Sequence, residues 1–373
     1  MPVNYEQLRS QIYQMGEKVS SRHMEEKKQM ERFSAWFGEA AAESGLSEKF
    51  DLILSENPNA RTAFPLEENI GDSFAEADPV QEKLRIFACD GSQVIPNRHD
   101  EVSFALLNTA VFEYVMNSGE TPRIDTITEL LDPDEDSGDD RMGVMRDEAE
   151  KRRLADAAES AEPGIPAIAI CDGPVELFMD RSDIKGLETL KANYRESLGR
   201  ITAAGVPIVG YIDRPKSNPV LTMLQLLNSG EPVILPDSAL FEKRLAPGER
   251  SAVFGMNSRF NRELRDELRL CFFYLNVGTA SAPCISRVEF PAWVAREPEK
   301  LDRVHSVLLA QCRILLGLPY PYVLHRAHEC AVVTFTEKDD IKNLLMDEML
   351  RRGLTLAAKS NKQTAKDLSG SAG

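Results

Sequence analysis

Two stretches of the chain share one pattern: Ile86-Phe87-Ala88-Cys89-Asp90-Gly91-Ser92 and Ile168-Ala169-Ile170-Cys171-Asp172-Gly173-Pro174. Each is an apolar run, typical of a buried strand, that stops on Asp-Gly. Such a strand delivers its last side chain to the edge of the sheet, and glycine lets the following backbone turn sharply or approach a ligand. If the two strands lie side by side, Asp90 and Asp172 come together. Close carboxylates repel each other unless a cation lies between them, so the pattern indicates a divalent-metal site.

The same pattern has a simpler interpretation. Asp-Gly is a common turn signal after a strand. The two stretches alone therefore leave both a metal site and a pair of ordinary turns open.

Length and charge limit the classes of function. The 373 residues can form one large domain or two smaller ones. The formal net charge of −16 argues against a protein that grips nucleic acid over its whole surface, because phosphate binding is driven by Lys and Arg. Any contact with nucleic acid must be a local basic groove or be shared with a more basic partner.

Cysteine usage and the N-terminus bear on the compartment. The six cysteines are scattered without a CxxC pair, which predicts buried free thiols in a reducing environment. The first residues show no basic and apolar leader pattern, and no run approaches the roughly 20 apolar residues that cross a bilayer. We expect a soluble, cytoplasmic protein that does not bind membranes.

The chain is predicted to contain an N-terminal helical arm over 1–50, a main domain over 51–355 and a disordered tail over 356–373. The acidic run from Asp132 to Asp140 predicts a flexible insertion at about 129–141. Expected strands lie at 84–90, 102–116 (one or two strands), 165–172, 206–212, 269–277 and 285–290. Expected helices lie at 4–43, 142–162, 187–204, 298–316, 321–333 and 338–352. This order favours a mixed α/β sheet with helices packed against it.

Ligands of open α/β sheets bind beyond the carboxyl ends of the strands, where Asp90, Asp172 and Asp213 are expected. The helix before the second Asp-Gly strand adds Glu148 and Glu150. One of these could reach over the sheet edge to a metal; alternatively, both are surface residues paired with the nearby Arg152 and Arg153.

Three further segments carry reactive or charged groups. His325 and His328 stand at i, i+3 on one expected helical face, as ligands, proton carriers or ordinary surface residues. The run Asp213-Arg214-Pro215-Lys216-Ser217 could hold a phosphate or form a solvated turn. Arg287 and Glu289 are interpreted as an internal ion pair.

The ordered set of motifs resembles the NurA nucleases over about residues 84 to 335. The set comprises the two Asp-Gly strands, Gly210-Tyr211-Ile212-Asp213-Arg214-Pro215, Arg287-Val288-Glu289-Phe290-Pro291, and Tyr320-Pro321 followed by Ala327-His328. The resemblance implies a ribonuclease-H-like α/β core related to the nuclease domain of Argonaute proteins. It implies manganese-dependent cleavage of DNA, as a 5′→3′ exonuclease and single-strand endonuclease. It also implies a homodimer acting with the hexameric ATPase HerA, a DNA translocase, in end resection during double-strand-break repair.

The resemblance also implies roles for individual residues. Asp90 and Asp172 would be metal ligands, joined by a helix-borne glutamate that is Glu150 or Glu148. We favour Glu150 because Arg146 precedes it by one helical turn. His328 would complete the metal shell or carry a proton. At the remaining matched positions, Tyr320 would orient a phosphate or the substrate, whereas His325 has no counterpart and is expected to be structural.

A ligand set of carboxylates and one imidazole suits Mn²⁺, or Mg²⁺, better than zinc. Cys89 and Cys171 each precede a proposed ligand in a strand, so alternation turns them to the opposite face. The acidic chain is expected to cleave DNA weakly alone and to be stimulated by its partner, with DNA contacted by residues drawn from Arg181, Arg214, Lys216 and Arg326.

Two other functions remain open from the sequence. A sugar-kinase-like ATPase of the same superfold also uses Asp-Gly-Ser strands, although we find no convincing second phosphate loop. A non-catalytic assembly partner of a DNA translocase could use the long N-terminal helix and the acidic surface to bind another protein.

Overall fold

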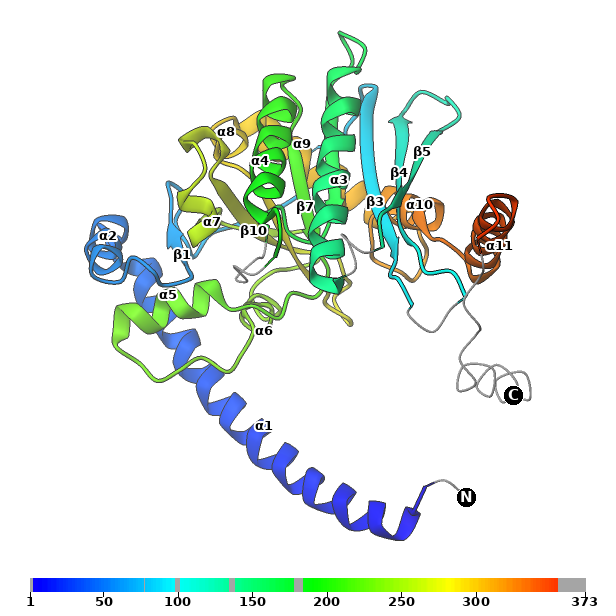
Figure 1. Ribbon diagram of the computed structural model, residues 1–373. Coiled ribbons are helices and arrows are strands. Elements are labelled where there is room, and N and C mark those ends of the chain that lie inside the picture. The colour runs from blue at the N-terminus through cyan, green and yellow to red at the C-terminus, as the bar shows by residue number, and fades with distance from the viewer. Residues whose placement is uncertain (1–2, 77, 98–100, 134–137, 178–183, 355–373) are drawn as a thin grey trace. The chain divides into compact units, whose positions relative to one another are not determined.

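The computed structural model describes residues 3–76, 78–97, 101–133, 138–177 and 184–354 (Figure 1). The chain forms two compact units. Unit 1 comprises Met1–Asp78 and Gly210–Ala310, and unit 2 comprises Pro79–Val209 and Gln311–Gly373. Within the described ranges, no helix has the length and apolar character that would carry it through a lipid bilayer.

Unit 1 is built on antiparallel strands in the order β1-β9-β10-β11, and the short β2 and β8 pair with each other and extend from β10. Residues 210–212 of β7 pair antiparallel with β11. The strands are β1 Thr62–Pro65, β2 Ser73–Phe74, β7 Ile208–Ile212, β8 Arg250–Ser251, β9 Phe254–Asn257, β10 Leu270–Asn276 and β11 Ile285–Pro291. The helices are α1 Tyr5–Ala42, α2 Leu46–Glu56, α5 Pro219–Asn228, α6 Asp237–Phe241, α7 Arg259–Arg262, the 3₁₀ helix Asp266–Leu268, α8 Ala292–Ala295 and most of α9 Pro298–Cys312.

The long helix α1 confirms the helix expected over residues 4–43. The side chain of Asn4 accepts a hydrogen bond from the Gln7 N–H and caps its first turn. Only the last third of α1 is buried: Met30, Phe33 and Phe37 join the apolar core that α5 and α6 contribute to. This end of the helix is therefore fixed by packing, whereas the part before residue 29 is almost entirely exposed.

Unit 2 contains the two Asp-Gly strands. Its elements are β3 Leu84–Val94, β4 Ala105–Met116, β5 Arg123–Leu131, α3 Asp139–Glu159, β6 Ala167–Asp172, α4 Leu187–Ala203, α10 Tyr322–Ala331 and α11 Phe335–Arg351. β3, β4 and β5 form an antiparallel meander, and β6 returns through α3 to lie parallel to β3 on its other side. The first two residues of β7, 208 and 209, also belong to unit 2. The strand order β5-β4-β3-β6-β7 is that of a ribonuclease-H-like sheet and confirms the expected fold class.

Helices cover both faces of the sheet in unit 2. α3 and α4 lie side by side (Figure 1), and α3 packs on β3, β4 and β6. α10 packs on the same strands. Ser92 in β3 contacts α10, whereas a side chain at the adjacent Gly91 would meet α3. Because neighbouring residues of a strand face opposite sides, α3 and α10 lie on opposite faces.

The first Asp-Gly stretch does not end its strand, contrary to the sequence interpretation. β3 runs four residues past Asp90, because β4 pairs with it as far as Val94 opposite Leu106. β6 does end at Asp172, where its ladder with β3 is already complete. Gly173 then takes a φ of +80°, a backbone conformation that glycine adopts without strain.

The acidic segment is shorter than expected. Residues 129–131 are the end of β5, and residues 139–141 are the first turn of α3. Asp139 and Asp140 stand at the positive N-terminal end of the helix dipole, which favours helix at a point that composition alone assigns to loop. Residues 134–137 lie outside the described residues, as does the tail from residue 355.

The two compact units do not follow the boundaries expected from sequence. The range 51–355 was expected to be one domain, but residues up to 78 and residues 210–310 belong with the N-terminal helix. The physical reason is the separate core of unit 1, in which α1, α2 and β1 share buried apolar side chains with α5, β9 and β10. Sequence order did not predict this core, because its parts are far apart along the chain.

Among the described residues, which include all six cysteines, no disulfide is formed; all but the half-buried Cys330 are buried, which confirms the expected burial of the thiols. Arg287 and Glu289 form the expected internal ion pair in β11, with Nη2 and Oε1 2.6 Å apart. Arg287 also donates to the Ser217 hydroxyl, so this pair ties the segment after β7 to β11 within unit 1.

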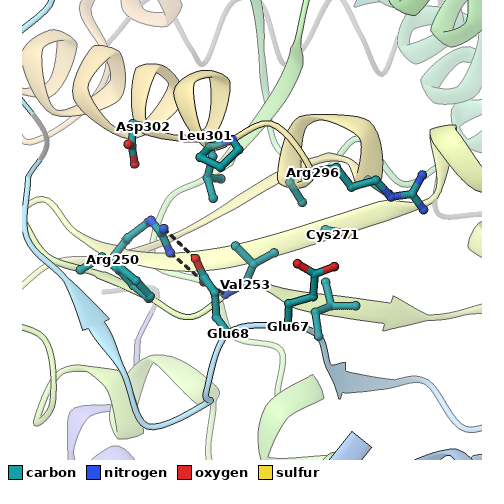
Figure 2. A pocket seen from close by; sticks show the side chains of 13 residues that line it. Glu67, Glu68, Arg250, Val253, Cys271, Arg296, Leu301 and Asp302 are labelled. Carbon is teal, nitrogen blue, oxygen red and sulfur yellow. Dashed lines mark hydrogen bonds and ion pairs between the residues drawn. The ribbon is translucent and has the colours of Figure 1, made fainter.

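Unit 1 also contains a cavity of about 560 Å³. It is lined by the loop after β1, by residues of β2, β8 and β10, and by helices α8 and α9. Figure 2 shows the bidentate pair of Arg250 and Glu68 against it. The Arg250 guanidinium lies 3.9 Å from the centroid of the Phe74 ring. None of the expected nuclease residues lines this cavity.

Candidate metal centre

The two Asp-Gly strands place Asp90 and Asp172 next to each other. β3 and β6 are parallel and in register from Arg85 opposite Ala167 to Cys89 opposite Cys171. The aspartates are the next residue in each strand, so both side chains leave the same face of the sheet. Desolvation and, to a smaller extent, the negative charge of Asp90 raise the pKa of Asp172, and the second effect is expected for neighbouring carboxylates. This sheet face is the one covered by α10.

Helix α10 brings an imidazole to this pair. His328 Nδ1 lies 2.7 Å from Asp90 Oδ2. The helix is held in place at its C-terminal end, where Ser92 Oγ and Asn108 Nδ2 both donate to the Ala331 carbonyl, at 2.5 and 2.8 Å. Paired with the carboxylate on one ring nitrogen, the imidazole keeps its other nitrogen for a ligand or a proton.

Tyr320, just before α10, reaches the second carboxylate. Its hydroxyl hydrogen-bonds to Asp172, and the Gly173 N–H does the same. Both bonds favour the charged carboxylate and oppose the effects of burial and of Asp90. Burial is the largest of these effects, and the pKa of Asp172 is raised above its ordinary value. Hydrogen bonds thus orient this carboxylate without cancelling the effect of burial on its pKa.

Glu150 approaches from the opposite face of β3. It lies on α3, is 6% exposed, and its carboxylate is 3.0 Å from the position that a Cβ on Gly91 would take. Burial raises its pKa to about 7, with contributions from the charges of Asp147 and Asp90. The absence of a side chain at Gly91 therefore leaves room for this carboxylate beside the strand that carries Asp90.

Two cations accompany Glu150 at a distance. Lys151 Nζ lies 3.5 Å from Oε2, and Arg146 Nε lies 3.6 Å from Oε1, across one helical turn. Lys151 is itself buried and lies 5.6 Å from the centroid of the Tyr194 ring. Sequence reasoning missed Lys151, because a lysine in a charged helix is typical of the surface; its only signal is its place beside Glu150.

The structure separates the two candidate glutamates. Glu148 is also buried, but its neighbours are Arg152, with Nε 3.6 Å from Oε1, and Glu129. Arg153 pairs with Asp125 and with neither glutamate. The interpretation of both as surface residues is therefore wrong, because α3 turns this side toward the sheet. Of the two, Glu150 is the one whose pKa responds to the charge of Asp90.

The remaining candidates are placed as follows. His325 pairs with Glu329, with Nε2 and Oε1 3.4 Å apart. Arg326 also pairs with Glu329. Arg214 and Lys216 follow β7 in unit 1. Arg181 lies outside the described residues.

The donor types in the centre determine which cation it could hold. Across the described ranges, no three His, Cys, Asp or Glu side chains are grouped closely enough to form a ready-made metal site. The chemistry of the set nevertheless fits a hard cation: Asp90 and Asp172 share a face with His328, and Glu150 lies beside β3. The raised pKa values of Asp172 and Glu150 reflect burial and repulsion that a bound cation would relieve. Cys89 and Cys171 are buried on the α3 side and take no part.

A family model of the NurA domain matches residues 84–333, which is more than half of the chain. The chain belongs to the NurA family. The matched region covers every residue of the centre, from β3 to α10. The NurA assignment thus agrees with the resemblance carried by the motifs of the sequence. No curated protein matches the chain in sequence.

Solved structures are similar to this NurA chain at low identity. The NurA nuclease from Sulfolobus solfataricus is 11% identical, with a TM-score of 0.49, over 90% of this chain and 98% of that one. NurA bound to dAMP and manganese is 10% identical, with a TM-score of 0.35, over 71% and 88%. Endonuclease V from Bacillus subtilis is 10% identical, with a TM-score of 0.34, over 72% and 83%.

Proposed function

We propose that this member of the NurA family is a divalent-metal-dependent nuclease that hydrolyses phosphodiester bonds of DNA. The observation that carries the proposal is the pair of aspartates, Asp90 and Asp172, on adjacent parallel strands, with His328 2.7 Å from the first. Such an arrangement costs stability and needs a reason. A cation-binding centre supplies that reason, and membership of the NurA family supports the nuclease reaction.

In this proposal Asp90, Asp172, Glu150 and His328 hold the metal. In this arrangement Glu150 would approach the other ligands past Gly91, where a side chain would come within 3.0 Å of its carboxylate. Bound divalent cations activate a water near neutral pH and stabilise the leaving oxygen of a phosphodiester. Manganese is the first choice, since a NurA structure contains it together with dAMP; Mg²⁺ suits the same oxygen-rich set.

Two residues of the chain contribute beyond holding the cation. Tyr320 orients Asp172 through its hydroxyl and can turn the same group toward a substrate phosphate. The imidazole of His328 is oriented by Asp90 and is largely exposed, so it can pass a proton between solvent and the reacting oxygens.

The test is degradation of DNA labelled at the 5′ or the 3′ end, with and without Mn²⁺. Parent protein should cleave only with the metal, and Asp172→Asn should lower the rate by about 1,000-fold, since the metal contributes several kcal/mol to the transition state. Asp347→Asn, which removes the same charge from an exposed position in α11, is the matched control. Parent-like cleavage by Asp172→Asn would sink the proposed site.

The finer activity is proposed from the resemblance of the motifs: a 5′→3′ exonuclease and single-strand endonuclease. The two end labels distinguish the polarity directly. A circular single strand tests the endonuclease, because it offers no end. If cleavage starts from 3′ ends, the proposed polarity is wrong while the nuclease assignment stands.

A HerA-type hexameric ATPase is the proposed partner, in DNA end resection and double-strand-break repair, with the chain acting as a homodimer. Support comes from family membership and from the net charge of −16, which opposes DNA binding by the chain alone. Activity at physiological salt should therefore rise when the ATPase is added. Equal activity alone and with the ATPase would contradict this part of the proposal, and light scattering at several concentrations tests the dimer.

A further inference from the structure

An apolar loop stands beside the metal centre. The segment Ile314-Leu315-Leu316-Gly317-Leu318-Pro319 joins α9 to α10 and is here called the leucine loop. Leu316 is 98% exposed, Leu318 50% and Ile314 44%. Exposed apolar side chains gathered in one short segment indicate a binding surface. Left in water they contribute nothing to the stability of the fold, whereas burial against a partner would be favourable.

The leucine loop is held in a defined shape. Backbone hydrogen bonds join Leu318 N to Leu315 O at 3.1 Å and Tyr320 N to Leu318 O at 2.8 Å. Gly317 takes a φ of +81°, which permits the tight turn that carries Leu316 outward. At the base of the loop, buried Gln311 accepts a hydrogen bond from the Val323 N–H and ties the end of α9 to the start of α10. The tip is therefore presented by a supported turn.

The loop leads directly into the site. Tyr320 follows it and bonds to Asp172. Leu316 is four residues earlier, so its Cα lies within about 14 Å of the Tyr320 Cα, the full reach of four extended residues. A phosphodiester positioned at Asp90 and Asp172 would place its neighbouring bases within that range.

The charge of the segment fits DNA as the occupant. No Asp or Glu stands between Asp302 and Glu329, although the chain has 60 acidic residues and a net charge of −16. The same span contains Arg303, Arg313 and Arg326. A neutral to basic segment in an acidic chain lets phosphates approach, and its apolar tip offers contact to base faces instead of to the backbone.

We propose that the leucine loop is a wedge that inserts Leu316 into the end of a DNA duplex and unstacks the terminal bases next to the metal centre. Apolar side chains such as Leu are the kind that separate stacked base steps. The separated strand then has access to Asp90 and Asp172. This inference rests on the proposed nuclease function and adds to it a structural basis for acting at duplex ends.

The experiment compares Leu316→Ser with parent protein on two substrates, a blunt duplex and one of its strands alone, both with Mn²⁺. The ratio of duplex-end cleavage to single-strand cleavage should fall about tenfold in Leu316→Ser. Leu316→Phe, which keeps an apolar wedge, should restore the ratio. Leu344→Ser on α11 removes an equally large side chain that is 68% exposed and should keep the parental ratio.

A second measurement does not depend on cleavage. A duplex with 2-aminopurine at its end brightens when the base is unstacked. Full-length parent protein without added metal should raise this fluorescence at saturation, and Leu316→Ser should not. Thermal unfolding of each variant checks that the fold is intact, which is expected because Leu316 makes almost no buried contact.

Several outcomes overturn the wedge. An unchanged ratio, or an equal loss on both substrates, removes it, and so does a loss seen only when a hexameric ATPase is present, which assigns the loop to a protein partner. If parent protein cleaves neither substrate with Mn²⁺, the proposed nuclease function fails, and the fluorescence still decides the wedge. If parent cleaves and only the ratio is insensitive to Leu316, the nuclease stands and the wedge fails.

Discussion

The two units place their structurally important acids in opposite surroundings. In unit 1, Glu68 receives two 2.9 Å hydrogen bonds from Arg250, and Glu289 receives one of 2.6 Å from Arg287. In unit 2, Asp172 and Asp90 lie beside each other, and no guanidinium or ammonium of the described residues is bonded to Asp172. An acid paired with an arginine, here called a matched acid, holds strands together. Acids that lie close to one another, here called crowded acids, repel each other and cost stability. Crowded acids are therefore better explained by a ligand than by the fold.

Breaking a matched pair should give the largest effect on stability. Arg250→Met leaves the Glu68 carboxylate without its partner and removes the stacking on Phe74. We expect the free energy of unfolding to fall by about 3 kcal/mol, near the lower end of the range for a broken buried pair because Glu68 is partly exposed. Chemical denaturation followed by circular dichroism measures this loss.

Two controls define the cause. Glu68→Leu added to Arg250→Met should recover part of the stability, because no buried charge is then left unpaired. Nuclease activity per folded molecule should not change in either variant. A loss of activity at full folding would mean that the comparison between the units is wrong and that this pair serves the reaction.

Substitution of an acid in the crowded group should lower the nuclease activity. Glu150→Gln is expected to lower Mn²⁺-dependent cleavage by about 100-fold, or about 2.7 kcal/mol, because it removes one proposed ligand. Glu148→Gln is the matched control, since it lies two residues away on the same helix, is similarly buried and is paired with Arg152. It should stay within about threefold of the parent. The reverse ranking would assign the ligand to Glu148.

Much of the centre could be predicted from sequence, because local pattern carried it. The apolar runs predicted the strands that hold Asp90 and Asp172, and their twin form suggested adjacency, which the parallel register of β3 and β6 provides. The spacing of Tyr320 and His328 matched a known family. In each case periodicity predicts the strand or helix, and the reactive group stands at a fixed number of residues from it.

The rest depends on partners distant in sequence. The extension of β3 past Asp90 follows from its pairing with β4, and the burial of Glu148 and Glu150 from the packing of α3 on the sheet. β5 was not predicted at all, because its nine residues mix charged, polar and apolar side chains at the edge of the sheet. Neither secondary-structure propensity nor charge pattern predicts which part of the fold a segment will pack against.

Asp237 sharpens the comparison because it is buried in unit 1 and is held by neutral donors. It accepts hydrogen bonds from the N–H groups of Val220 and Leu221, at 2.7 and 2.8 Å, and from the Tyr274 hydroxyl at 2.7 Å. Burial still raises its pKa to about 6, although these bonds and the charge of Arg287 oppose the increase. Hydrogen bonds from neutral groups thus do not fully replace a paired cation.

The raised pKa predicts a pH dependence of defined sign. Between about pH 4 and pH 6 the folded protein keeps a proton on Asp237 that the unfolded chain releases, so stability falls as pH rises through this window. The fall is about 2 kcal/mol, because a tenfold difference in proton affinity between the folded and unfolded states corresponds to about 1.4 kcal/mol. Glu150, with a pKa of about 7, acts in the same direction over a pH window that extends higher.

Asp237→Asn should flatten the curve of unfolding free energy between pH 4 and pH 6, while Asp347→Asn keeps the parental slope. Parallel curves for parent and Asp237→Asn would show that the three hydrogen bonds compensate the buried charge completely. A buried acid held only by neutral hydrogen-bond donors would then be as stable as one paired with an arginine.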